Sequence, residues 1–338
     1  NIQLLKQNDM KVIQFFAITA MAAAMFTSCS NDEELVQSNF PSDNIIRVTA
    51  GVNNAKTRGN EAGGTLLDKD FLLTIVNKNA EKYTYINKQF SKTAGEWKCS
   101  ETLLWQNATT LVDIAAFAPA QTTVFDNVYK NDAFQSFAYS VAADQRDGSA
   151  NNDLLYYYKK DFNPGDELVD KKLNLQFNHA FSMIDIVVTL GTQFNVPNIP
   201  SETPITEVTV EGTKLEADVN VTNETGIVTV KESAKATVIT ATKGAFTSVN
   251  NDVKKSCTSK FSCIAIPQTI AAKTFKIILN VNGKFYEWTL ADAITLKSGY
   301  KYTINLTMGN DVALTNSESF TAKPWTASED SGSSIETE

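Results

Sequence analysis

Residues 275–290 read FKIILNVNGKFYEWTL, and they carry the strongest local structural signal in the chain. Two runs rich in β-branched and aromatic residues, Phe275–Val281 and Lys284–Leu290, flank the dipeptide Asn282-Gly283. An Asn-Gly pair in this position favours a type I′ turn, whose twist matches that of the two strands it joins. The stretch therefore predicts an antiparallel β-hairpin.

Similar patterns recur along most of the chain, whereas helical periodicity is scarce. Alternating or continuous apolar runs predict strands at Phe71–Val76, Lys82–Ile86, Thr110–Ala118, Leu173–Phe177, Met183–Leu190 and Tyr300–Met308. Many short strands in a chain of this length predict an all-β protein with two antiparallel β-sandwich domains in tandem.

A polar, charged stretch at residues 161–172 contains a Pro-Gly pair and marks the predicted boundary between the two domains. We therefore assign residues 45–168 to an N-terminal β-sandwich and 169–325 to a C-terminal one. Residues 326–338 are rich in Ser, Thr and Glu with one apolar residue, so we expect a disordered tail. Residues 29–44 are expected to form a flexible tether.

The amino-acid composition argues against several classes of function. The 338 residues are 43% hydrophobic and 20% charged, which is typical of a globular protein with an apolar core. The formal net charge of −8 would repel phosphate backbones, so we expect no nucleic-acid partner. His179 is the single histidine, and histidine is the commonest general base and metal ligand. We therefore expect no enzymatic activity, no cofactor and no metal.

The N-terminal residues have the pattern of an export signal. An apolar run, Val12–Phe26, follows Lys11 and is shorter than a membrane span requires. Residues 1–28 are predicted to be a signal peptide with an upstream extension before Met10. Small residues and Cys29 end the run, an arrangement that resembles a bacterial lipobox and implies lipidation of Cys29. The alternative is a plain signal peptide with an incidental cysteine.

Three further cysteines are Cys99, Cys257 and Cys263. Cys257 and Cys263 flank a turn-like Thr-Ser-Lys segment, so they could pair with each other or stay as buried thiols. The spacing of cysteine and histidine gives no metal-binding pattern.

His179 lies between Phe177 and Phe181 in an alternating apolar strand. We expect its imidazole to point into or along a core and to bond a backbone carbonyl. A catalytic pair with Ser182 is disfavoured, because residues three apart on a strand point to opposite faces.

The loop Asp144–Asp153 has enough oxygen-bearing side chains for a calcium site but lacks the spacing of a calcium-binding loop. An Asx-rich hydrogen-bonded turn is the better interpretation. The adjacent Tyr156, Tyr157 and Tyr158 could form a sugar-stacking platform, but Tyr157 should point away from the other two. Core packing is therefore expected for these rings.

Several motifs, in order along the chain, resemble those of the fimbrillin family of Bacteroidetes, the subunits of type V pili and their lipoprotein relatives. The motifs are Asp113–Pro119 (DIAAFAP), Val141–Leu155 (VAADQRDGSANNDLL), Leu173–Ile186 (LNLQFNHAFSMIDI), Ile264–Ile270 (IAIPQTI), Ser298–Leu306 (SGYKYTINL) and Trp325. The resemblance implies two transthyretin-like β-sandwich domains. The acidic run after Cys29 is likewise similar to the surface-export signal of lipoproteins in that phylum.

The segment Ile45–Val52 alternates apolar residues and predicts a strand, and the polar residues that follow it suit an exposed loop. In the resembled family an Arg-specific protease cuts after a Thr-Arg dipeptide in such a loop and removes the N-terminal strand. Arg58 and Gly59 occupy that position here. The resemblance implies that a partner's C-terminal region, for which Val312–Trp325 is a candidate, replaces the lost strand. An incidental basic loop is the alternative.

The sequence thus predicts a fimbrial subunit or adhesin-like lipoprotein, held in the outer membrane at the cell surface through Cys29. Its expected partners are other fimbrial subunits and a surface glycan or protein. The alternative function is a monomeric glycan-binding surface lipoprotein. A glycoside hydrolase is a third, remote possibility.

Overall fold

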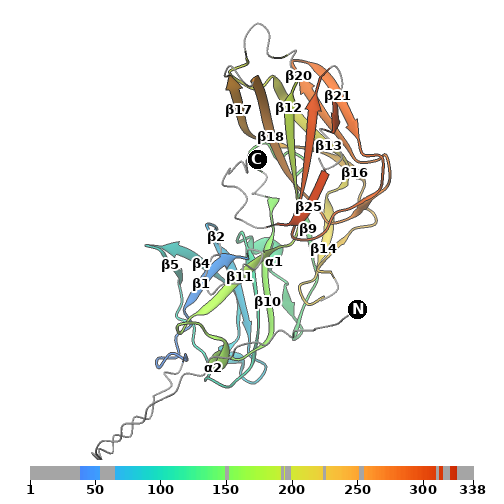
Figure 1. The fold of residues 1–338 in the computed structure, drawn as a ribbon. Coiled ribbons are helices and arrows are strands. Elements are labelled where there is room, and N and C mark those ends of the chain that lie inside the picture. The colour runs from blue at the N-terminus through green and yellow to red at the C-terminus, as the bar shows by residue number, and fades with distance from the viewer. Residues whose placement is uncertain are drawn as a thin grey trace, which may run out of the picture. The chain divides into compact units, whose positions relative to one another are not determined.

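The computed structural model of the chain describes residues 39–53, 65–148, 152–191, 194, 199–223, 226–250, 255–309, 312–314 and 320–325. The described residues are mostly in β-strands, in several sheets consistent with two β domains (Figure 1). Helix is confined to three single turns, η1 (Glu81–Tyr83), α1 (Thr122–Phe125) and α2 (Pro164–Glu167), in this part of the chain. None of them is long and apolar enough to cross a membrane.

Most strands of the N-terminal half form one large sheet. In spatial order its strands are β2 (Thr65–Leu66), β1 (Val48–Val52), β11 (Leu173–His179), β10 (Leu155–Phe162), β6 (Val112–Ala118), β3 (Phe71–Val76), β4 (Tyr85–Thr93) and β5 (Glu96–Cys99). The two faces of β6 contribute to different apolar clusters, which explains why every residue of this strand is buried. The predicted strand over Thr110–Ala118 is confirmed.

Two sheets hold most of the C-terminal half. The first contains β17 (Thr242–Asn250), β18 (Lys255–Ala265), β12 (Ser182–Leu190), β23 (Tyr300–Met308) and β24 (Val312–Leu314), with β25 (Phe320–Pro324) also paired to β23. The second contains β16 (Ala236–Thr240), β13 (Ile205–Lys214), β20 (Lys276–Val281) and β21 (Lys284–Thr289). An apolar cluster draws side chains from both sheets, as in a sandwich.

Three small sheets complete the described structure. They are β15 (Val228–Val230) with β14 (Glu216–Val219) and β9 (Phe137–Ser140), β19 (Thr269–Ile270) with β22 (Ile294–Thr295), and β7 (Tyr129–Lys130) with β8 (Ala133–Phe134). The first of these joins the two halves, because β9 precedes residue 168 and β14 follows it.

The Asn-Gly hairpin is confirmed. β20 and β21 pair in antiparallel register from Lys276↔Thr289 to Val281↔Lys284. Asn282 and Gly283 have φ angles of 49° and 86°, the positive values that a type I′ turn requires at both central residues. The strands predicted at Phe71–Val76 and Lys82–Ile86 correspond to β3 and β4, which pair as an antiparallel hairpin, although β4 begins at Tyr85 and runs on to Thr93.

Two strand pairs depart from the expected antiparallel arrangement. β1 runs parallel to β11, and β12 runs parallel to β23. Parallel neighbours need a long crossover connection, and in both pairs more than a hundred residues separate the partners. A local pattern carries no information about a partner at that sequence distance.

β11 belongs to the N-terminal sheet, where it lies between β1 and β10. A boundary after residue 168 would assign β11 to the other half. The chain passes from the first large sheet to the second between His179, the last residue of β11, and Ser182, the first residue of β12. The polar stretch at 161–172 forms part of β10 and the turn α2, inside the N-terminal half.

Candidate assembly strands and the gap between β1 and β5

β1 lies in the N-terminal sheet beside β11, to which it is paired over five residues from Val48↔Leu173 to Val52↔Phe177. On its other side β2 pairs only with Gly51 and Val52. Val48, Ala50 and Val52 are buried in the core of this half, so the predicted strand and its apolar face are confirmed. β1 thus fills a core while one of its edges is largely open.

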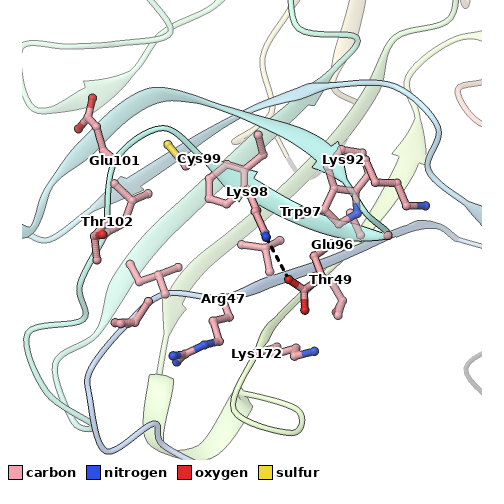
Figure 2. Close-up of a pocket in the computed structure, with 17 residues that line it drawn as sticks. Arg47, Thr49, Lys92, Glu96, Trp97, Lys98, Cys99, Glu101, Thr102 and Lys172 are labelled. Atoms are coloured by element: carbon pink, nitrogen blue, oxygen red, sulfur yellow. Dashed lines mark ion pairs between the residues drawn. The ribbon is translucent and has the colours of Figure 1, made fainter.

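A gap with a volume of about 420 Å³ separates the open edge of β1 from β5, the last strand of the sheet. Figure 2 shows Arg47, Thr49 and Lys172 on one side of this gap, with Glu96 and Lys98 of β5 opposite. One end is closed where the backbone N–H of Ile46 donates to the carbonyl of Leu103 at 2.9 Å and residues 45 and 104 form a bridge.

The gap has an apolar interior and a charged rim. Side chains of alternate residues on a strand point to opposite faces, so Trp97 and Cys99 face inward while Glu96 and Lys98 face solvent. Phe90 and Leu103 complete the inner wall and are buried. Among rim residues, Lys98 Nζ lies 3.5 Å from a carboxylate oxygen of Glu96 (Figure 2). Arg47 forms a two-point contact with Asp43, and its guanidinium lowers the pKa of that carboxyl.

At the C-terminal side, β25 pairs antiparallel with β23 from Tyr300↔Pro324 to Ile304↔Phe320. Its residues are exposed or half-buried, unlike those of β1. The next residue, Trp325, stacks on His179 with ring centroids 3.5 Å apart and planes within 12°. The candidate donor segment Val312–Trp325 therefore contains two strands, β24 and β25, both seated on β23.

His179 lies at the end of β11, and its side chain is largely buried, as expected. Its hydrogen-bond partner differs from the prediction. The Nδ1 atom lies 2.7 Å from Oδ2 of Asp153, so a carboxylate takes the place of the predicted backbone carbonyl. Asp153 sits just before β10, which brings it beside the end of β11 in the sheet. Ser182 turns elsewhere and donates to the carbonyl of Lys297 at 2.9 Å.

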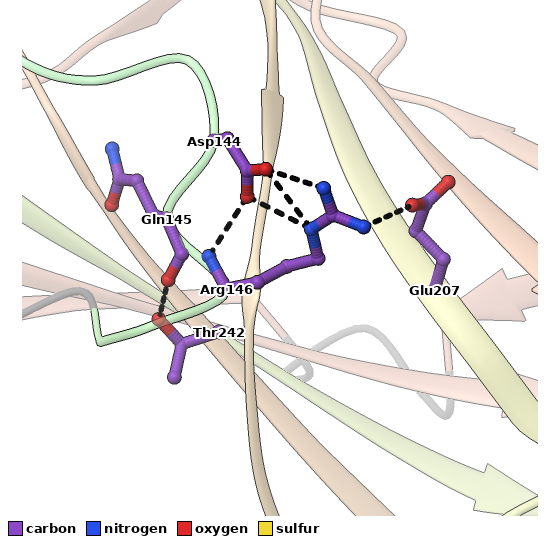
Figure 3. Close-up of polar contacts among 5 residues, drawn as sticks. All are labelled: Asp144, Gln145, Arg146, Glu207 and Thr242. Carbon is purple, nitrogen blue, oxygen red and sulfur yellow. Dashed lines mark hydrogen bonds and ion pairs between the residues drawn. The ribbon is translucent and has the colours of Figure 1, made fainter.

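The loop after β9 connects the two halves through buried Gln145. Its side-chain amide donates to the carbonyl of Ile264 at 2.8 Å, and its amide oxygen accepts the backbone N–H of the same residue at 2.8 Å. The Thr242 hydroxyl donates to the backbone carbonyl of Gln145 (Figure 3). The Gln145 side chain thus makes the same pair of hydrogen bonds to β18 that the backbone of a neighbouring strand would make.

Asp144 in the same loop accepts the backbone N–H of Arg146 at 3.1 Å, which is the predicted Asx turn. The Arg146 guanidinium also holds this carboxylate and lowers the pKa of Asp144 to about 2 (Figure 3). The second carboxylate beside Arg146 is that of Glu207, at 4.0 Å. Asp144 therefore neutralises an arginine, and across the described residues acidic, cysteine and histidine side chains form no group of three suited to a metal.

The three consecutive tyrosines behave as expected. Tyr157 packs against the core of the N-terminal half, while Tyr156 and Tyr158 point to the opposite face and contact the cluster that both halves share. Burial raises the pKa of Tyr157 to about 12. The rings serve packing and form no continuous platform.

Cys257 and Cys263 lie on one strand, β18, with both side chains buried. Six residues of extended chain separate their Cα atoms by about 20 Å, whereas a disulfide requires less than about 7 Å. They do not pair with each other, and the expected turn between them is wrong, because β18 runs through it. Burial raises the pKa of the Cys263 thiol to about 12.

Cys29, Arg58 and Gly59 lie outside the described residues, so lipidation and cleavage there stay predictions. The structure adds residues that the sequence did not single out for function, namely Trp97, Lys98 and Lys172 at the gap. Asp153, the last residue of the loop considered for calcium, is instead the hydrogen-bond partner of His179. The alternation of charged and apolar residues in Glu96–Cys99 was a usable signal for the inner and outer faces of β5.

A family model described as fimbrillin-like matches residues 37–325, most of the chain. The chain belongs to the fimbrillin-like family. The resemblance that the motifs suggested is confirmed. No protein among the curated sequences matches the chain.

Solved structures with the same fold come from Bacteroides species. A cell adhesion protein from Bacteroides uniformis has 17% identity and a TM-score of 0.53, covering 85% of this chain and 100% of that one. One from Bacteroides ovatus has 17% identity and a TM-score of 0.55, covering 83% and 97%. A fimbrial protein from Bacteroides vulgatus has 13% identity and a TM-score of 0.50, covering 83% and 99%. At these identities the similarity shows the fold alone.

Proposed function

We propose that this fimbrillin-like chain is a fimbrial subunit or adhesin at the cell surface that assembles by strand exchange. The observation that carries the proposal is the placement of β1. It supplies Val48, Ala50 and Val52 to a core, and it is the first strand along the described chain. Its removal would leave an apolar groove beside the exposed backbone edge of β11, and such an edge recruits another strand.

Family membership and the structural neighbours support this function. Among the proteins that share the fold, one is described as fimbrial and two as cell adhesion proteins. In this proposal the two halves are transthyretin-like β-sandwiches, the partners are other fimbrial subunits, and the protein is not an enzyme.

Cleavage after Arg58 would release β1, because the residue lies in the segment that follows β1 directly. The chain has only three arginines, and two of them, Arg47 and Arg146, hold ion pairs with nearby carboxylates. An Arg-specific protease at limiting dose therefore gives a simple product pattern. A partner's Val312–Trp325 segment is the candidate replacement for β1.

The test compares the unaltered chain with Arg58→Gln after such digestion, using mass spectrometry for the cut and native gels for size. We expect cleavage after Arg58 followed by oligomers whose size increases with protein concentration, and neither in Arg58→Gln. A cut chain that stays monomeric, or an Arg58 that is never cut, would favour the monomeric glycan-binding lipoprotein.

We further propose that Cys29 is acylated and holds the protein in the outer membrane. One acyl chain gives marginal membrane binding and two or more give stable anchoring, so a multiply acylated Cys29 would suffice. Cys29→Ala should move the protein from the membrane fraction to the periplasm or medium, with Cys99→Ala as the matched control. Unchanged fractionation of Cys29→Ala would exclude the anchor.

A further inference from the structure

The gap between β1 and β5 has the size and closure of a small-molecule site. Its volume of about 420 Å³ falls within the range of roughly 300–1,000 Å³ that is usual for ligand pockets. The hydrogen bond at Ile46 closes one end, and the pairing of Gly51 with β2 occupies the other. The open edge of β1 is therefore only Arg47–Ala50, about 13 Å of extended chain. A long partner strand has no room along this edge while β1 is in place.

The chemistry of the walls is amphipathic. Inside, the gap presents the apolar side chains of Val48, Ala50, Phe90 and Leu103, all largely buried, and the half-buried ring of Trp97. Trp97 packs edge-on against Phe71 at a centroid distance of 4.9 Å, which fixes its ring. A preformed apolar slot of this kind suits a hydrocarbon or an aromatic body.

The rim of the gap is positively charged in a protein that carries a net charge of −8. Four cations, Arg47, Lys92, Lys98 and Lys172, line it together with two carboxylates, Glu96 and Glu101. Two residues outside the rim pair with rim residues: Asp43 with Arg47 and Lys88 with Glu101. Their opposite charges cancel, so the excess of positive charge at the rim remains.

Two of the four rim cations have no carboxylate within 4 Å among the described residues: Lys92, which lies over the ring of Trp97, and Lys172. An excess of positive charge around a concave, apolar site concentrates anions there. A ligand with one anionic group would gain an ion pair at this rim that a neutral ligand of the same shape would lack.

We propose that the gap binds a small amphipathic carboxylate, with its apolar body between β1 and β5 and its carboxylate at Lys172 on the rim. This assignment does not depend on strand exchange, because it concerns the intact chain with β1 in place. Since β1 forms one wall, the bound ligand also contacts the strand whose removal the proposed function requires.

Cys99 provides a reporter inside the site. It lies half-buried on the inner wall, while Cys257 and Cys263 are buried. The experiment measures the rate of iodoacetamide alkylation of Cys99 in the uncut full chain, with peptide mapping to assign the modified residue. Dodecanoate below its micelle concentration is the probe, and methyl dodecanoate is the uncharged control. We expect dodecanoate to slow alkylation several-fold at concentrations where the ester has little effect.

The variant Lys172→Gln removes one rim charge, and Lys160→Gln makes the same change at an exposed position outside the gap. We expect Lys172→Gln to lose much of the protection by dodecanoate and Lys160→Gln to keep it. Thermal melting of both variants establishes that they are folded, and dodecanoate should raise the melting temperature of Lys160→Gln more than that of Lys172→Gln.

Three outcomes would overturn the proposal. Dodecanoate and its methyl ester could protect Cys99 equally, which would leave the rim charge without a role. Dodecanoate could give no protection at all. Finally, an extended apolar peptide or anionic lipid vesicles could protect where dodecanoate does not, which would make the gap a protein or membrane contact. None of these results depends on cleavage after Arg58, so the two proposals fail separately.

Discussion

β1 and β25, one near each end of the described chain, are held in contrasting ways. Both pair with a neighbour over five residues, β1 in parallel with β11 and β25 in antiparallel with β23. β1 places buried apolar side chains in a core, whereas β25 is exposed or half-buried along its length. The two strands therefore have the same extent of backbone pairing but very different side-chain burial. Burial of apolar side chains makes the larger contribution to stability.

The difference in burial bears on the proposed strand exchange. Loss of β1 would remove its buried side chains from a core, so in this proposal it needs an irreversible step such as cutting the chain. Release of β25 gives up backbone pairing and the contact of Trp325 with His179, so it can be reversible. The proposed strand exchange, in which a subunit loses β1 and offers its C-terminal strands, would require this asymmetry.

The largest expected difference between β1 and β25 arises when a charge is placed in each strand. Val48→Asp puts a carboxylate into the core beside β11, and we expect it to lower the free energy of unfolding by about 4 kcal/mol. Ala322→Asp makes a similar change on exposed β25 and should stay within about 0.5 kcal/mol of the unaltered protein. Urea denaturation measures both. Equal losses would show that the two strands are held alike.

A smaller effect is expected when the contact between His179 and Trp325, the residue that follows β25, is removed. Trp325→Ala removes the ring that stacks on His179, and we expect the local opening of β25 to become easier by about 1 kcal/mol. Amide hydrogen exchange should accelerate in β25 and remain unchanged in β1. The exposed substitution Lys323→Ala in the same strand is the control. Faster exchange in β1 as well would mean that Trp325 supports the whole fold.

The smallest perturbation is alkylation of single thiols, which compares Cys99 in the N-terminal half with Cys263 in the C-terminal half. Cys99 lines the gap, while Cys263 is buried and its pKa is raised to about 12 by burial. Because the thiolate is the reactive form, Cys263 should stay unmodified at about pH 9, where Cys99 is alkylated. Modification of Cys263 should begin only as the pH approaches its raised pKa or as the fold opens. Equal rates at the two thiols would contradict a closed C-terminal core.

The features that could be predicted from sequence are local. The hairpin at Asn282-Gly283, the apolar face of β1 and the opposite faces of Tyr156 and Tyr157 all follow from the two-residue period of a strand or from turn chemistry. Motif order also led to the correct family, since the matches span most of the chain.

The features that were missed depend on residues distant in sequence. The partner of His179 is Asp153, which only the β10–β11 pairing brings near. The expected turn at Thr258–Lys260 is instead the middle of a long strand, held by β12 and β17 on its two sides. The gap exists because β1 and β5, far apart in the sheet order, approach each other.

The small sheet that joins β9 to β14 has a mechanical consequence. The halves are linked covalently between His179 and Ser182, and beside that link lie the four residue pairs of β9 with β14 and the bonds of Gln145 to Ile264. A pulling force transmitted from one half to the other is therefore shared among several hydrogen bonds in addition to the backbone. Stretching the molecule must break this set before the short connection carries the whole load.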